Sequence, residues 1–439
     1  MKHRVLRSLN LALIVVLALA ASAAAQSSAP GPRITPEASP SSVSPEVAAE
    51  QVGGWTIADR QDIKVDGQPV AISPDAKWIA GIGPDKNFCV WDVAALDATC
   101  DDSELAIQPE TIVWAPDSSA VAFSLEAAKY FVDSDIYVFD VETGELADLT
   151  DDGENGAVGF DMDPGAGPVF LDIYPAWSPD SSQLLFSRTN WNAEKRATTL
   201  MTIDRDGGEP ELLFTLAPPE PLIIYSPMYW LGDDSIVFSV WHADPDNGQN
   251  GIWMRSPSGK MTKVLAGDST AEVPMPRITS VTGNGRIATV FSAILQAQYG
   301  SQGTSKIYFF LDLQTGDVFD VPPTAGQDVT DTRTVDTPVV SLPARLSADD
   351  KQVVYSVRQG NGQQLVIADA ATGDATFLPF DETFAPVAYF QGLQLAAGNA
   401  LFMPTNGSGA GTATILTLEP PAAAPTPPPP CSCTPPKGA

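Results

Sequence analysis

Residues 175–187 read PAWSPDSSQLLFS: an apolar run that ends at Trp177, a short turn, and a second apolar run that begins at Leu184. Pro179 fixes the backbone φ that the first central position of a β-turn requires. Asp180 and Ser181 can bond their own backbone, which also favours a turn. The stretch therefore predicts a β-hairpin.

The same phrase returns along the whole chain. The other copies read ISPD (72–75), WAPD (114–117), WLGD (230–233), VTGN (281–284), LSAD (346–349) and AGN (397–399). A third apolar strand follows each hairpin and often ends in Asp, as in IYVFD at 136–140. In five copies a turn containing Gly comes next, such as Thr143-Gly144, and then a more polar fourth strand. Glycine supplies the positive φ that a tight connection between antiparallel strands needs.

Four antiparallel strands in each of seven units predict an all-β fold, a seven-bladed β-propeller, with six and eight blades as open alternatives. Strands such as LLF at 184–186 do not alternate apolar and polar residues, so both of their faces must be covered. A stack of sandwich sheets would alternate more cleanly and is the second choice. The seventh unit ends after its third strand, near Glu419. An isolated strand at Trp55–Ala58 can supply the missing fourth strand and close the ring.

The chain divides into four segments. Residues 1–25 have a basic start, an apolar run and small residues before a cleavage point, which predicts a signal peptide; an uncleaved anchor is the alternative. Residues 26–52 predict a disordered Ser/Pro/Ala linker, 53–419 the propeller, and 420–439 a Pro-rich tail. No other stretch is long and apolar enough to span a bilayer. We expect a monomer that is secreted or lies in the cell envelope or periplasm, with no transmembrane span after cleavage.

The formal net charge of the chain is −30, which argues against nucleic acid as a partner because the phosphate backbone is also anionic. Such a chain tolerates cations and basic protein surfaces, although the charge could serve solubility alone. Cys89 and Cys100 could form a disulfide across neighbouring strands in an oxidising compartment. Cys431 and Cys433 in the tail could pair, cross-link to a partner, bind a soft metal, or have no role.

The WSPDS phrase with its downstream Phe-Ser, and DLTDDG at 148–153, resemble the WD-like repeat of TolB-type propellers. The resemblance covers about residues 55–419, and it implies a periplasmic or secreted propeller that acts as a binding platform. TolB itself has an additional N-terminal α/β domain and six blades, and residues 26–52 are too short for that domain. Prolyl-oligopeptidase-like enzymes carry similar propellers together with a hydrolase domain. We expect no such domain here, because no Gly-x-Ser-x-Gly motif occurs.

In a propeller blade, the turns from first to second and from third to fourth strand lie on one side of the disc. Nearly all of those turns are short here, so the variation in length falls on the other side, where repeat folds usually bind ligands. The aromatic and imidazole side chains expected on that side are Tyr130, Trp191, Trp241, His242 and Tyr299. With the carboxylates nearby, including Asp172, they suit a sugar, a peptide or a cationic ligand. The alternative is that they anchor their own loops.

Two pairs of carboxylates in these connections, Asp161 with Asp163 and Asp244 with Asp246, could hold Ca²⁺. Neither pair completes an EF-hand loop, and solvated turn carboxylates are the simpler interpretation. We expect no other cofactor. Catalysis has little support, because His242 is the only histidine after the predicted signal peptide and no nucleophile stands out.

These observations lead to one expected function and one alternative. The expected function is an exported, non-enzymatic propeller that binds an unidentified envelope or extracellular protein, peptide or glycan on the side with variable connections. The alternative is a propeller hydrolase or lyase that uses loop carboxylates, with calcium as its one candidate cofactor.

Overall fold

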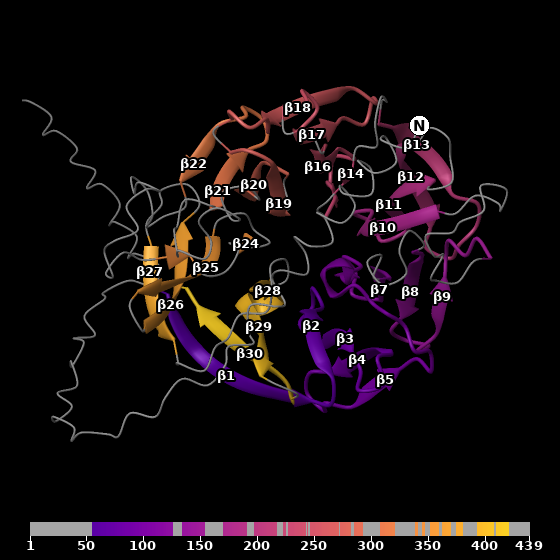
Figure 1. The fold of residues 1–439 in the computed structure, drawn as a ribbon. Coiled ribbons are helices and arrows are strands. Elements are labelled where there is room, and N and C mark those ends of the chain that lie inside the picture. Colours follow the sequence, from indigo (N-terminus) through magenta and orange to yellow (C-terminus); the bar gives the residue numbers. More distant parts are fainter. Residues whose placement is uncertain are drawn as a thin grey trace, which may run out of the picture.

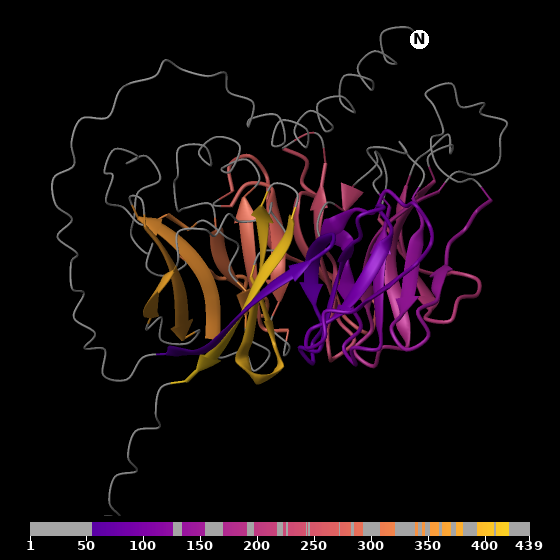
Figure 2. The same cartoon turned by 90° about the horizontal axis from the view of Figure 1, so that it is seen from below.

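The computed structural model describes residues 55–125, 134–153, 170–190, 197–216, 223–224, 227–242, 244, 246–271, 273–281, 285–292, 308–320, 339–340, 345–346, 352–359, 362–369, 375–380, 393–407 and 410–420. These residues form seven antiparallel sheets around a common axis (Figure 1). Figure 2 shows the ring from its edge, with the strands running between its two faces. The predicted signal peptide, the linker at 26–52 and residues 421–439, including Cys431 and Cys433, lie outside the described residues.

In the first three sheets around the ring, the hydrogen-bonded order of the strands follows chain order. The first contains β2 (Gln68–Ile72), β3 (Trp78–Ile82), β4 (Phe88–Asp92) and β5 (Ala98–Cys100). The second follows the 3-10 turn η1 (Pro109–Thr111) and contains β6 (Val113–Trp114), β7 (Ala120–Ser124), β8 (Ile136–Asp140) and β9 (Leu146–Asp148). The third contains β10 (Phe170–Trp177), β11 (Gln183–Asn190), β12 (Thr198–Asp204) and β13 (Glu211–Thr215).

Three further sheets continue the ring, and in two of them the inner strand is divided. In the fourth sheet β14 (Ile223–Ile224) and β15 (Tyr229–Trp230) both pair with β16 (Ile236–Trp241), before β17 (Gly251–Arg255) and β18 (Met261–Ala266). The fifth contains β19 (Pro276–Val281), β20 (Ile287–Ser292), β21 (Tyr308–Asp312) and β22 (Val318–Asp320). In the sixth, β23 (Val339–Val340) and β24 (Arg345–Leu346) both pair with β25 (Gln352–Gln359), before β26 (Gly362–Asp369) and β27 (Ala375–Phe380).

The last sheet joins the two ends of the described chain. It contains β28 (Gln394–Ala396), the 3-10 turn η3 (Ala397–Asn399), β29 (Ala400–Gly407), β30 (Ala410–Glu419) and, as its outer strand, β1 (Thr56–Val65). Thr56 lies opposite Glu419, and Val65 lies opposite Gly411. The prediction that an N-terminal strand completes the last unit is confirmed. The strand is longer than the expected Trp55–Ala58, because it pairs along almost the whole length of β30.

The apolar core lies between neighbouring sheets. One buried cluster joins Ala122 and Val138 of the β6–β9 sheet to Trp177 and Phe186 of the β10–β13 sheet. Comparable clusters connect most other neighbours around the ring, and β19 contacts β24 where the fifth and sixth sheets meet. The second strand β7 is buried along its full length, whereas the outer strand β13 is largely exposed. The expected β-propeller of four-stranded antiparallel units, each covering its neighbours' flanks, is therefore confirmed.

The repeated phrase forms the hairpin turn that the sequence predicts. Ser181 N donates to Ser178 O at 3.0 Å, and Ser178 N donates to Gln183 O at 2.9 Å. Ser181 has a φ of 64°, and the same position in the two preceding copies also has a positive φ. The Asp180 carboxylate accepts hydrogen bonds from the hydroxyl groups of Ser178 and Ser182. Ser-Pro-Asp thus sets both the turn and the register of the two strands that it connects.

Candidate ligand-binding face

The ring has two faces, which we name by their connections. The tight-turn face carries the turns between first and second and between third and fourth strands, such as Ser178–Ser181 and Asp204–Gly207. The variable-loop face carries the connections between second and third strands and between sheets, such as residues 242–250.

On the tight-turn face, polar groups of one sheet bind the next sheet. Asp117 N donates to Ser181 Oγ at 3.2 Å, and Trp177 Nε1 donates to Val113 O at 3.1 Å. The preceding junction repeats both bonds, with Asp75 N donating to Ser118 Oγ and Trp114 Nε1 to Ala71 O. The repeated Trp and Ser therefore hold neighbouring sheets together, which is a structural role.

Arg205 is a cation of the tight-turn face. Its Nη2 donates to Asp140 Oδ2 at 2.7 Å, and its Nη1 donates to Ser119 Oγ at 2.6 Å and lies 4.0 Å from Asp117 Oδ2. Arg205 follows β12, whereas its three partners belong to the β6–β9 sheet. Both terminal nitrogens of the guanidinium group thus contact protein oxygens, so Arg205 joins two sheets.

On the variable-loop face, two of the predicted ligand residues lie where β16 ends: Trp241 is the last residue of the strand, and His242 is the first residue of the connection to β17. Trp241 Nε1 contacts Met275 Sδ at 3.2 Å. His242 is buried, and its Nδ1 accepts a hydrogen bond from Asp244 N at 3.0 Å. Asn250 fixes the same loop by accepting from His242 N and donating to Asp244 O. An imidazole used in this way shapes the loop, and its Nδ1 lone pair does not face solvent as a general base.

The carboxylates of Asp244 and Asp246, one of the two predicted calcium pairs, are exposed on this loop. Asp244 Oδ1 accepts from Asp246 N at 3.0 Å, and Asp246 Oδ1 accepts from the Ser269 hydroxyl. Both therefore have local partners, as turn carboxylates commonly do. Among the residues that the structure describes, no group of three or more His, Cys, Asp or Glu side chains is arranged to hold a metal ion.

A buried ion pair lies at the variable-loop end of the β10–β13 sheet. Asp172 and Arg188 are directly opposite each other on β10 and β11. Arg188 Nη2 lies 2.6 Å from Asp172 Oδ2, and Nε lies 2.8 Å from Oδ1. The guanidinium carbon is 4.4 Å from the centre of the Phe170 ring and 5.4 Å from that of Phe186. Burial raises the pKa of Asp172 to about 6, and the neighbouring Arg188 opposes this rise.

The same region is tied to the preceding sheet. Asp172 N donates to Ser134 O at 2.8 Å, next to a parallel bridge between Ser134 and Leu171. Thr150 Oγ1 donates to Asp135 Oδ1 at 3.1 Å and accepts from Ile136 N at 3.0 Å. Ser134, Asp135 and Thr150 are all buried. The Asp172–Ser134 bond therefore joins the two sheets, and the bonds of Thr150 fix the segment of the preceding sheet that contains Ser134.

The structure brings only part of the predicted site into view. Trp241, His242, Asp244 and Asp246 share one loop, whereas Tyr130, Trp191, Tyr299, Asp161 and Asp163 lie outside the described residues. Asp172, expected in a connection, lies in the strand β10. Sequence reasoning missed Arg188, which it placed at the start of a loop although β11 continues to Asn190. Its only sequence signal is a basic residue directly after the repeated Phe-Ser, in a chain with few cations.

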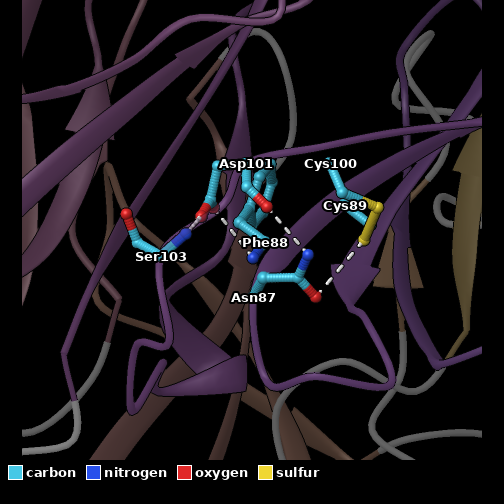
Figure 3. Close-up of a disulfide and its surroundings, with 6 residues drawn as sticks. All are labelled: Asn87, Phe88, Cys89, Cys100, Asp101 and Ser103. Atoms are coloured by element: carbon cyan, nitrogen blue, oxygen red, sulfur yellow. Dashed lines mark hydrogen bonds between the residues drawn. A yellow bond between two sulfur atoms is a disulfide. The ribbon is translucent and has the colours of Figure 1, made fainter.

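Cys89 and Cys100 form the expected disulfide (Figure 3). They are direct partners on β4 and β5, at the variable-loop ends of these strands. Next to the bridge, the Asp101 carboxylate accepts from Phe88 N at 3.0 Å, and Asn87 Nδ2 donates to Asp101 O at 2.8 Å. The disulfide therefore fixes the end of the sheet where no tight turn connects the two strands. In the part of the chain that the structure describes, no helix is long and apolar enough to cross a bilayer.

No family model matches the sequence, and no curated protein matches it either. Solved structures with a similar fold include oligogalacturonate lyase from Vibrio parahaemolyticus, with a TM-score of 0.51 and 10% identity over 83% of this chain and 98% of the lyase. TolB from Acinetobacter baumannii has a TM-score of 0.40 and 16% identity, and the match covers 71% of this chain and 63% of TolB. Acylaminoacyl peptidase from Pyrococcus horikoshii has a TM-score of 0.47 and 13% identity, and the match covers 78% of this chain and 51% of the peptidase. The chain thus spans less than two thirds of TolB and about half of the peptidase. At these identities the likeness concerns the fold alone: the chain is a β-propeller.

Proposed function

We propose that the protein is an exported binding scaffold without enzymatic activity, which recognises a protein, peptide or glycan through its variable-loop face. The ring would count seven blades, one for each sheet. The binding function would require no cofactor.

The different use of polar groups on the two faces carries this proposal. On the tight-turn face, Ser181, Trp177 and Arg205 bind the neighbouring sheet. On the variable-loop face, the carboxylates of Asp244 and Asp246 are exposed beside Trp241. Binding residues are carried preferentially by loops, and an aromatic side chain with carboxylates nearby suits a sugar, a peptide or a cationic ligand.

Export is supported by two independent observations. The first is the basic and apolar composition of residues 1–25, followed by small residues. The second is the Cys89–Cys100 disulfide, because such bonds persist in oxidising compartments.

The test is capture of partners from the cell envelope or medium of the source cell by matched variants. Asp244→Asn with Asp246→Asn removes two charges from the variable-loop face. Glu142→Gln with Asp206→Asn removes two charges from exposed turns of the tight-turn face. We expect the first pair to weaken capture and the second to leave it unchanged. Capture that depends only on the second pair would contradict the proposal.

Enzymatic turnover is the competing outcome, and it needs its own measurement. Activity screens and thermal melting would be run before and after treatment with a chelator. An activity that is lost with the chelator, and also in Asp244→Asn with Asp246→Asn, would overturn the non-enzymatic proposal in favour of a calcium-dependent hydrolase or lyase.

A further inference from the structure

Arg188 differs from an ordinary structural arginine in how its two edges are used. Asp172 binds the edge formed by Nε and Nη2. Among the residues that the structure describes, Nη1 contacts no hydrogen-bond acceptor. An arginine side chain carries five N–H donors in a rigid planar fork, so three donors remain for another partner, two on Nη1 and one on Nη2.

The pair exposes its cation and hides its anion. The side chain of Arg188 is 14% exposed, whereas that of Asp172 is 0% exposed. A ligand that approaches the ion pair therefore meets the guanidinium group before the Asp172 carboxylate. The part-buried carboxylate of Asp152, which accepts a hydrogen bond from Phe170 N at 3.1 Å, is the other charge at this place. The net charge of −30 repels anions at long range, but salt screens such interactions beyond about 8 Å at physiological ionic strength. The local cation therefore decides which group can bind at this point.

The guanidinium group is also held in place before any ligand arrives. Asp172 fixes its direction with two hydrogen bonds, and the ring of Phe170 lies against its plane. Asp172 is itself fixed, because its backbone N–H donates to Ser134 O on the neighbouring sheet. Pre-organisation of this kind reduces the entropy that a ligand must overcome when it binds.

The position of the pair is that of a ligand site. Both residues lie two positions from the variable-loop ends of β10 and β11. β10 is the innermost strand of its sheet and faces the axis of the ring (Figure 1). Binding sites in closed β-architectures lie where the loops surround such an axis.

We propose that Arg188 anchors the carboxylate of a ligand at the variable-loop face, through the edge formed by Nη1 and the second N–H of Nη2. This proposal rests on the proposed function and specifies the chemistry of the ligand. The carboxylate comes from a peptide or from a sugar acid. A carboxylate can form two parallel N–H···O bonds with the planar fork of arginine, and phosphate, which can do the same, is the competing anion in the test.

The experiment uses the full chain labelled with ¹⁵N-arginine and follows the Arg188 side-chain signals by NMR. Two pairs of probes are compared. N-acetylphenylalanine is compared with its uncharged amide, and glucuronate is compared with uncharged glucose. At least one of the two carboxylates should shift the Arg188 signals, and the uncharged counterparts should not; the carboxylate that does so identifies the source. Failure of both carboxylates would overturn the proposal. Inorganic phosphate that binds as tightly as the better carboxylate would also overturn it.

Variants supply the second readout. Arg188→Lys keeps the charge but loses the fork, and it should weaken the binding of the carboxylate about 10- to 100-fold. Arg205→Lys on the tight-turn face is the matched control and should bind as the wild type does. If Arg188→Lys does not fold, Asp172→Asn with Arg188→Gln removes both charges together, which buried pairs tolerate better. Binding of wild-type strength by either Arg188 variant would contradict the proposal.

The outcome is separable from that of the proposed function. Partner capture could depend on Asp244 and Asp246 while the Arg188 signals do not respond to carboxylates. That result would support the binding scaffold and contradict the carboxylate site. If the variants of the two faces captured partners equally well, the proposed function would instead be contradicted.

Discussion

Arg188 and Arg205 both come from the β10–β13 region and both bind an aspartate, but they lie at opposite ends of its strands. Arg205 joins two sheets, and both of its terminal nitrogens contact protein oxygens. Arg188 binds a carboxylate of its own sheet and leaves one edge of its guanidinium group without a partner among the described residues. The difference teaches that one end of the ring uses its charges for assembly, while the other end holds a charge in a position where a ligand can reach it.

The largest predicted effect is a difference in unfolding free energy between variants of the two arginines. Arg188→Gln leaves the buried Asp172 without its partner and should cost about 3–5 kcal/mol of unfolding free energy. Arg205→Gln breaks a more exposed pair and should cost about 1 kcal/mol or less. Urea denaturation of both variants measures the difference. Equal costs would show that the two pairs do not differ in burial as described.

The raised pKa of Asp172 should make the stability of the protein depend on pH. Its pKa is about 6 in the folded protein against an ordinary value of 3.8, so the folded state binds the proton more tightly than the unfolded state. The stability should therefore fall as the pH rises from about 4 to about 6, by roughly 3 kcal/mol from this group. Carboxylates of the tight-turn face, such as Asp140, have a lowered pKa and act in the opposite direction at lower pH.

Asp172→Asn isolates that effect. The difference in unfolding free energy between the wild type and this variant should change across pH 4 to 6 and remain constant above pH 7. A difference that does not depend on pH would mean that Asp172 has an ordinary pKa. Asp140→Asn should show no change in the same window.

The disulfide tests whether the variable-loop end of a sheet needs a bond of its own. Cys89→Ala with Cys100→Ala should lower the unfolding free energy by about 2–3 kcal/mol, because the unfolded chain gains conformational freedom. Reduction of the wild type should have a similar effect on its melting temperature and none on the variant, which still contains Cys431 and Cys433. A variant as stable as the wild type would show that the other β4–β5 contacts suffice.

The smallest effect concerns the bonds between sheets on the tight-turn face. Trp177 Nε1 donates to Val113 O, whereas the buried Nε1 of Trp230, at the same place in the next sheet, has no hydrogen-bond partner among the described residues. Trp177→Phe should therefore cost about 1 kcal/mol more than Trp230→Phe. Urea denaturation of the two variants measures this difference. The reverse order would contradict the role that we assign to the repeated tryptophan.

Much of the fold could be predicted from local sequence. Ser178-Pro179-Asp180 sets its turn through its own backbone and side chains, so each copy of the phrase marks a hairpin. The closing strand could be predicted because the last unit lacked a fourth strand. Its length could not, since pairing of Thr56–Val65 depends on β30, which is remote in sequence.

The candidate site was less accessible to such reasoning. Trp241 and Asp244 stood out by residue type, yet the structure shows that both side chains have partners within the protein, Met275 for Trp241 and Asp246 N for Asp244. Arg188 depends on Asp172 in another strand, and only the strand register shows that they are partners. Register and burial are tertiary properties, so a pattern of residue types along the chain does not contain them.

Site-specific photo-crosslinking in the source cell tests the central claim most directly. A photoreactive residue would replace Asp246 on the variable-loop face or, as the matched position, Asp206 in an exposed turn of the tight-turn face. We predict that position 246 forms adducts with a partner and that position 206 does not. Adducts from position 206 alone, or equally from both, would contradict the division of the ring into an assembly face and a recognition face.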